Sequence, residues 1–171
     1  KGSVLFSEKQ YFKIDDHEDF KFGTGDWAIE YWWNGHPNGG YNSVINTLVF
    51  SGELGTWRVG NTFNGNNQIY FATGTGSGFQ DIVFGVDVND NKWHHIAFVR
   101  SSGVIIPFVD GADKTSDKVS GSTSVSGSLS TTNPVIIGFN DRDNNYIHGH
   151  VSNLRVVKGT ALYTSNFTPP T

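Results

Sequence analysis

A short acidic loop in the last third of the chain has the residue types that bind a hard metal ion. Asp141, Asp143 and Asn144 lie within the run Asn140-Asp141-Arg142-Asp143-Asn144-Asn145. Carboxylate and amide oxygens at alternating loop positions are typical ligands of Ca²⁺. The sequence therefore predicts a calcium site at Asp141, Asp143 and Asn144. The alternative is an Asx-rich turn, in which these side chains bind their own backbone.

A second set of side chains has the chemistry of a sugar site. A flat ring packs against the C–H face of a sugar, while amide, imidazole and carboxylate groups bind its hydroxyls. We expect three aromatic residues beside polar loops to stack on a ligand and three polar residues to hydrogen-bond it: Tyr41, Trp57, Tyr146, His36, Asn64 and Asp141. The alternative is that these rings lie at the rim and cap the core from the side.

Catalytic carboxylates are not expected. Glycoside hydrolysis needs two carboxylates across the scissile bond. The chain has the glutamates Glu8, Glu18, Glu30 and Glu53, and none lies in a Glu-x-Asp-x-x-Glu pattern that would place a pair on one strand. Glu30 shares a strand face with Trp32, which suits either a sugar site or a structural glutamate hydrogen-bonded at the sheet. We therefore predict a protein that is not an enzyme.

Two histidines form a weaker metal pattern. His148 and His150 flank Gly149 and point the same way on a strand. Two imidazoles could bind zinc or copper, but zinc takes at least three protein ligands and the sequence places no third one. We expect His148 and His150 to face solvent and His95, on another strand, to be an interior histidine.

The composition predicts an all-β, turn-rich domain. The chain has 171 residues, 36 % hydrophobic, 16 % charged and 14 % aromatic, with 21 glycines and no cysteine. So many aromatics argue against disorder, and Ala, Leu, Glu and Lys are too few for a helix bundle. A net charge of −4 without Lys or Arg runs argues against nucleic-acid partners. No apolar run reaches the roughly 20 residues of a membrane span. A start at Lys1 without any Met predicts a processed chain or an excised domain.

Short apolar runs separated by Gly, Asn and Ser turns predict an all-β sandwich spanning residues 1–171. The expected strands are Val4–Phe6, Tyr11–Ile14, Trp27–Trp33, Val44–Phe50, Thr56–Val59, Gln68–Thr73, Gln80–Val86, Trp93–Arg100, Val104–Val109, Val135–Phe139 and Ile147–Lys158. Aromatics on both faces of Trp27–Trp33 indicate that both faces are covered or that a bulge changes the register.

The loops and the tail complete the expected arrangement. Residues 115–133 are read as an excursion within the domain, held by Val119, Val125 and Leu129. We expect the tail Tyr163–Thr171 to pack back on the sandwich through Phe167. Four loops are expected to converge on one rim and carry the ligand: Asn34–Asn42, Asn61–Asn67, Gly74–Phe79 and Asn140–Tyr146.

Three stretches together resemble a known family. They are Phe20–Trp32, then Trp93–Arg100 followed by Phe108–Gly111, and last Ile137-Gly138 followed by Gly149–Tyr163 and Asn166–Pro170. In this order they resemble a laminin G-like, concanavalin A-like jelly-roll domain of the lectin type. The ending Arg155–Pro170 is similar to modules of bacteriophage virion proteins and large surface proteins. Where relatives often carry an Asp-Gly pair, this chain has Ser7-Glu8.

The resemblance implies two packed antiparallel sheets, a structural calcium, and binding of glycans or proteins by rim loops or the concave face. It predicts a non-enzymatic module on an extracellular or virion surface that binds a glycan or cell-surface polysaccharide. Its partners would exclude nucleic acid, and it would not insert into a membrane. The alternatives are a structural or adhesion domain that contacts other virion or fibre subunits of a phage tail, and a glycoside hydrolase.

Overall fold

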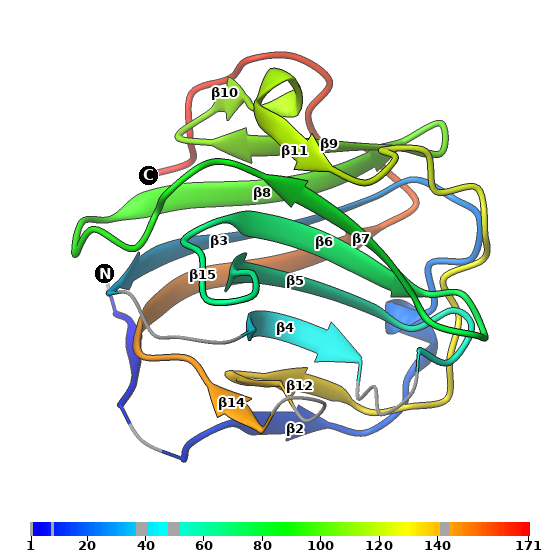
Figure 1. The fold of residues 1–171 in the computed structure, drawn as a ribbon, viewed down its shortest axis with the longest axis horizontal. Helices are drawn as coiled ribbons and strands as arrows, with labels where there is room; N and C mark the ends of the chain where they lie inside the picture. Colours follow the sequence, from blue (N-terminus) through cyan, green and yellow to red (C-terminus); the bar gives the residue numbers. More distant parts are fainter. Residues whose placement is uncertain (1, 8, 37–40, 48–51, 141–143) are drawn as a thin grey trace.

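The computed structural model describes residues 2–7, 9–36, 41–47, 52–140 and 144–171. Two antiparallel sheets pack face to face, and Figure 1 looks onto the seven-stranded one with the other sheet behind it. The all-β sandwich predicted from the sequence is confirmed. In the part of the chain described, no helix is long and apolar enough to cross a membrane.

The six-stranded sheet has the order β1-β15-β3-β8-β9-β10. These strands are β1 (Val4–Phe6), β15 (Gly149–Lys158), β3 (Trp27–Gly35), β8 (His94–Ser101), β9 (Val104–Val109) and β10 (Ala112–Asp113). The first and last long strands of the chain are thus neighbours, because β15 lies between β1 and β3.

The seven-stranded sheet has the order β11-β7-β6-β5-β4-β12-β2. These strands are β11 (Lys118–Ser120), β7 (Phe79–Phe84), β6 (Ile69–Gly74), β5 (Trp57–Thr62), β4 (Asn42–Thr47), β12 (Val135–Ile137) and β2 (Phe12–Ile14). A two-stranded ribbon, β13 (Phe139–Asn140) and β14 (Asn145–Tyr146), follows β12, and two 3₁₀ turns are η1 (Glu18–Phe20) and η2 (Thr115–Asp117).

Period-two alternation places the core between the sheets. On β3 the side chains of Trp27, Ile29, Tyr31 and Trp33 point inward and are at most 2 % exposed. Ala28 belongs to a separate apolar cluster on the opposite face of the same strand. Both faces of β3 are therefore covered, which explains its aromatic residues on both sides.

The C-terminal segment covers that outer face, as the sequence predicted. The Tyr163 and Phe167 rings stack with their centres 3.5 Å apart, and the Phe167 ring also contacts Phe108 of β9. The Phe167 N–H donates to the Gly111 carbonyl. In Figure 1 this segment, coloured red, passes beside β9 and β10.

One expected strand is interrupted at a glycine. The predicted strand Val135–Phe139 divides at Gly138, whose φ of +94° is unfavourable for other residues, and whose Cβ would meet the Phe6 ring. In the excursion 115–133, Val125 and Leu129 are buried as predicted. Val119 is 61 % exposed, so its assignment as an anchor is wrong.

The expected convergence of four loops on one rim is wrong in one part. The turn between β5 and β6 and the turn between β6 and β7 lie at opposite ends of the sheet, because these strands are antiparallel. Gly74–Phe79 therefore lies at the far end, where the Gly76 N–H donates to the Gly52 carbonyl. The described parts of the other three loops share the near end, as Asn42 pairs with Thr62 and the Asn140 amide donates to the Tyr41 carbonyl.

Candidate functional site

An open groove with two tryptophans in its wall lies on the outer face of the six-stranded sheet. Its volume is about 340 Å³. The residues that line it are Gly2, Ser3, Trp32, Trp93, Ser152, Asn153 and Thr171. A neutral, largely aromatic hollow with a few hydroxyl and amide groups is suited to an uncharged, polyhydroxylated ligand.

The strand register explains why both indoles face this groove. Trp32 of β3 is opposite His95 of β8, and Trp93 precedes His95 by two residues, so all three point to the outer face. Trp32 and Trp93 are thus diagonal neighbours on adjacent strands. Trp32 is half-buried, whereas Trp93 is 43 % exposed because it comes just before β8 begins.

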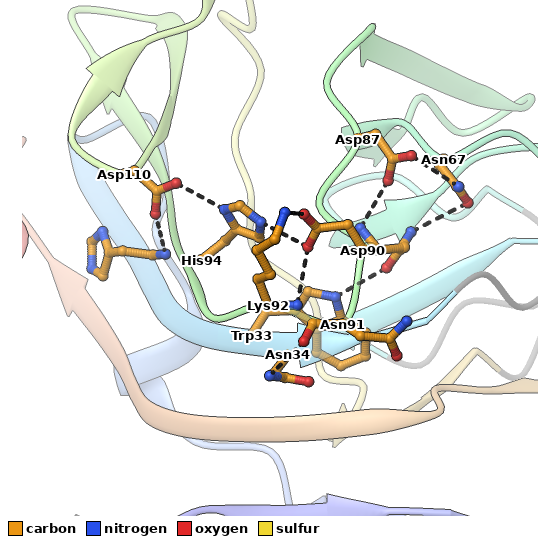
Figure 2. Close-up of polar contacts among 11 residues, drawn as sticks. Trp33, Asn34, Asn67, Asp87, Asp90, Asn91, Lys92, His94 and Asp110 are labelled. Carbon is orange, nitrogen blue, oxygen red and sulfur yellow. Dashed lines mark hydrogen bonds and ion pairs between the residues drawn. The ribbon is translucent and has the colours of Figure 1, made fainter.

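A polar network fixes the segment that carries Trp93 (Figure 2). The Asp90 carboxylate accepts hydrogen bonds from the backbone N–H and the ammonium of Lys92, at 3.0 and 2.7 Å. The His94 ring bridges Asp90 and Asp110, at 3.1 and 2.8 Å. Trp93 lies between these two anchored residues, so its backbone is held in place by its sequence neighbours.

The charged side chains of this network stabilise one another in their ionised forms. The hydrogen bond from Lys92, with help from His94, lowers the pKa of Asp90 to about 2. Partial burial alone would lower the pKa of His94, but the hydrogen bonds with Asp110 and Asp90 outweigh it and raise the pKa above its ordinary value. Asp90 is therefore ionised at neutral pH and holds Lys92 and His94 beside Trp93.

A buried amide joins this loop to the core. Asn89 is 3 % exposed, accepts a hydrogen bond from the Trp33 indole at 3.0 Å and donates to the Asn61 carbonyl at 2.8 Å. Asn67, between β5 and β6, donates a hydrogen bond to Asp87, which lies in the same loop as Asn89. The segment 87–92 was not among the sequence predictions. Its run Asp-Val-Asn-Asp-Asn-Lys between two strands was the signal that could have identified it.

The C-terminal segment forms another wall of the groove. The Trp32 indole Nε1 donates to the Pro170 carbonyl, 3.2 Å away, and Thr171 lines the hollow. On the same face, Glu30 is 3 % exposed and accepts hydrogen bonds from Tyr163 Oη at 2.8 Å and Arg155 Nε at 2.6 Å.

Glu30 is thus a structural residue, as one of the two interpretations predicted. Burial alone would raise its pKa, but hydrogen bonds from His95 and Tyr163 and the charge of Arg155 outweigh burial and lower the pKa below its usual value. A carboxylate held ionised and enclosed by three side chains is poorly placed to donate a proton to a ligand. His95 is buried, as predicted, between Trp32 and Phe167.

A second hollow of about 260 Å³ lies near the groove, since His150 in its lining contacts Trp93 and Ser3 of the groove. His36, His148 and His150 line it together with Asn34 and Asn91. The His36 and His148 rings lie 5.9 Å apart in an edge-to-face arrangement. His36 is a predicted ligand-binding residue, and this hollow is where the structure places it. Within the described ranges no group of three or more His, Cys, Asp or Glu side chains could hold a metal ion.

The structure contradicts the prediction for Trp57. It is 1 % exposed, its ring lies 5.0 Å from Phe22, and its indole donates to the Phe20 carbonyl. Trp57 opens β5 and points between the sheets, so it belongs to the core and cannot stack on a ligand. A polar loop before a residue does not exclude burial when the strand begins at that residue.

The remaining predicted rings lie at the near end but on the side of the seven-stranded sheet. The half-buried Tyr41 contacts the Phe63 ring edge-on, and Tyr146 stacks on Phe139 with ring centres 4.4 Å apart. Asn64 is exposed in the turn after β5, with a φ of 49°. None of these three lines the tryptophan groove, so the structure does not gather the predicted set into one site.

The predicted calcium ligands can be followed only in part. Asp141 and Asp143 lie outside the described residues. This applies to Asp141 both as a predicted sugar-binding residue and as a predicted calcium ligand. Asn144 is exposed with a φ of 52°, the left-handed conformation that Asn adopts in tight turns. Calcium at this loop stays a prediction, and none of the site chemistry described above depends on it.

Comparison with known proteins identifies relatives of the whole sandwich. The family profile described as the concanavalin A-like lectin/glucanases superfamily, of the laminin G type, matches residues 6–162. A search of curated protein sequences finds no match.

Solved structures with the same fold are distant in sequence. Domains LG4-5 of the mouse laminin alpha1 chain align with a TM-score of 0.66 and 16 % identity over 95 % of this chain and 46 % of that one. Domain 4 of AbnA, an extracellular GH43 arabinanase from Geobacillus stearothermophilus in complex with arabinotriose, gives 0.65 and 12 % over 93 % and 71 %. The CBM40 of the Ruminococcus gnavus IT-sialidase, bound to alpha2,3 sialyllactose, gives 0.62 and 11 % over 95 % and 92 %. This chain thus spans less than half of the laminin structure, and these likenesses establish the fold.

Proposed function

Because this chain belongs to the concanavalin A-like lectin/glucanase superfamily, we propose that it is a non-enzymatic carbohydrate-binding module whose ligand lies in the groove between Trp32 and Trp93. The observation that carries this proposal is the exposed Trp93 ring, held by a hydrogen-bonded loop at the wall of an open neutral groove. The ligand surface is therefore the outer face of the six-stranded sheet, and not the rim loops expected from the sequence.

The physical chemistry of the groove supports a sugar ligand. An indole ring removes a large apolar area from water when it packs on the C–H face of a sugar. Ser3, Ser152 and Asn153 supply hydroxyl and amide groups beside the rings. Because the backbone around Trp93 is fixed in advance, binding costs less conformational entropy.

Two of the similar structures support a carbohydrate ligand by analogy. The arabinanase domain is described in complex with arabinotriose and the sialidase module bound to sialyllactose. The arabinanase is also described as extracellular, which is consistent with an extracellular location for this chain. A virion surface remains the second proposed location.

Binding without catalysis is favoured by the state of the acidic side chains. Glu30, the glutamate nearest to the groove tryptophans in sequence, is enclosed by Tyr163, Arg155 and His95. No residue lining the groove, among those the structure describes, is Asp or Glu. A hydrolase site would need two carboxylates facing the bound sugar.

A structural role in a fibre is the second candidate, and an apolar edge of the sandwich favours it. Val4, Leu5, Tyr11 and Phe12 are each more than two-fifths exposed. Val4 and Phe12 line a hollow of about 530 Å³ between β1 and β2, the edge strands of the two sheets. Exposed apolar surface of this kind marks protein contacts. In that case the protein would associate with other subunits through this edge, which sedimentation at rising protein concentration measures.

Affinity electrophoresis tests the carbohydrate proposal. Native gels containing neutral and acidic polysaccharides should retard the wild-type protein in at least one of them, and Trp93→Ala should abolish the retardation. The matched control is Leu54→Ala, because Leu54 is 70 % exposed at the opposite end of the sandwich. Equal migration of wild type and Trp93→Ala in every gel would reject the groove as the site.

A further inference from the structure

We propose that the tryptophan groove and the neighbouring histidine hollow form one extended site for an internal stretch of a linear, neutral polysaccharide. This inference rests on the proposed function and specifies its ligand class. It predicts that the protein recognises a run of several sugar units, and not a single terminal sugar. The hollow defined by His36, His148 and His150 would then be a second subsite beside the groove.

Side-chain contacts connect the linings of the two hollows. His150 lines the histidine hollow, and its ring lies 6.1 Å from the ring of Trp93, which lines the groove. Ser3, also in the groove, hydrogen-bonds to His150 Nδ1 at 3.2 Å. A ligand that leaves the groove over Trp93 therefore meets His150 next and enters the second hollow.

The strand register gives the direction and the length of this path. Trp32 and Asn34 are two residues apart on β3, so both point to its outer face. His150 of β15 is paired with Asn34. Trp32 lines the groove and Asn34 lines the hollow, so the path follows β3 toward the near end. From Trp32 to Gly35, where β3 ends, the strand rises about 10 Å. This is longer than one sugar ring and therefore fits a chain.

The lining chemistry selects an uncharged chain. Among the residues described, neither hollow is lined by Asp, Glu, Lys or Arg. The nearest charged pair in the loop is Lys92 and Asp90, and these two bind each other. The second hollow has amide and imidazole groups, which can donate hydrogen bonds to hydroxyls and accept hydrogen bonds from them. Stacking dominates the first subsite and hydrogen bonding the second.

The test is a chain-length series. The probes are the mono- to hexasaccharides of the neutral polysaccharide that retards the wild type most, titrated by calorimetry at pH 7.5. We expect the wild-type affinity to rise by at least about tenfold between the disaccharide and the tetrasaccharide. His148→Ala should remove this rise and leave the disaccharide affinity within about twofold of the wild type. Trp93→Ala should weaken all lengths.

Each variant is first compared with the wild type by circular dichroism and thermal unfolding. Ser7→Ala is a second variant at the same hollow that removes only a hydroxyl. Affinity that is equal for the disaccharide and the hexasaccharide would overturn the extended site while leaving the groove proposal intact. An unchanged length dependence in His148→Ala would also overturn it. Failure of every length to bind the wild type would overturn the proposed function itself, which is a distinguishable outcome.

Discussion

The indole Nε1 of Trp32 donates a hydrogen bond to the carbonyl oxygen of Pro170, 3.2 Å away. This contact joins the C-terminal segment to the wall of the candidate sugar groove. The same segment covers Glu30 through Tyr163 and His95 through Phe167. The tail therefore has two roles, since it completes the outer face of the six-stranded sheet and supports one of the two groove tryptophans.

Deleting Tyr163–Thr171 should destabilise the protein strongly. The deletion removes the stacked rings of Tyr163 and Phe167 and exposes the apolar cluster around Phe108. We expect the free energy of unfolding to fall by about 3 kcal/mol or more. For a domain of this size that corresponds to a melting temperature lower by roughly 6–12 °C. Calorimetry measures it, with Phe167→Ala as the milder variant, and an unchanged melting temperature would contradict the role of the tail.

Glu30 should give the protein an acid-sensitive contribution to stability. Its pKa in the folded protein is below the ordinary 4.5, because hydrogen bonds from His95 and Tyr163 and the charge of Arg155 outweigh burial. The unfolded chain therefore binds this proton first, and the stabilisation is present above about pH 4.5 and lost as the pH falls through the folded-state pKa. Glu30→Gln should be less stable than the wild type at pH 7, and the difference should shrink below pH 4.5. A stability difference between Glu30→Gln and the wild type that is the same at pH 7 and below pH 4.5 would be inconsistent with an ionised Glu30.

Asn89→Ala should loosen the near end of the sandwich. Its buried amide binds the Trp33 indole, the Asn61 carbonyl and the Thr62 hydroxyl. Removing it leaves buried donors and acceptors without this partner, which costs about 1–3 kcal/mol. We expect faster amide hydrogen exchange in residues 87–92. The control is Asn66→Ala, since Asn66 is exposed and its amide bonds only within its own turn. Equal exchange in both variants would argue against Asn89 as an anchor.

Calcium at Asp141 and Asp143 remains a prediction from the sequence. An ion that binds only the folded state stabilises it by mass action. A chelator should therefore lower the melting temperature of the wild type, and Asp143→Ala should show no response to the chelator. Identical melting curves of the wild type with and without chelator would contradict the predicted calcium site.

The alternation of residue types made most of the sandwich predictable. Aromatics on both faces of Trp27–Trp33 indicated either that both faces are covered or that a bulge changes the register. The structure has the first arrangement, in which the tail anchored by Phe167 provides the second cover. The hairpin of β8 and β9 was predictable because Ser102 and Gly103 form a short turn between two apolar runs.

The site was less predictable, because it depends on strand register and chain direction. Trp57 and Trp93 both follow polar segments, yet Trp57 points between the sheets and Trp93 lies just outside β8 on the outer face. Which residues share a face of neighbouring strands depends on pairing that no local pattern contains. The Gly74–Phe79 loop was misplaced for the same reason, since its end of the sheet is set by the antiparallel order of β5, β6 and β7.

The indole N–H signals of the five tryptophans test the central claim most directly. In a ¹⁵N-labelled sample titrated with the polysaccharide that retards the wild type, we expect the Trp93 and Trp32 signals to shift. The signals of Trp27, Trp33 and Trp57 should stay in place, because these rings are at most 2 % exposed in the core. Binding with both groove signals unchanged, and with shifts confined to the backbone amides of Tyr41, Asn64 and Tyr146, would contradict the groove and locate the ligand at the rim loops.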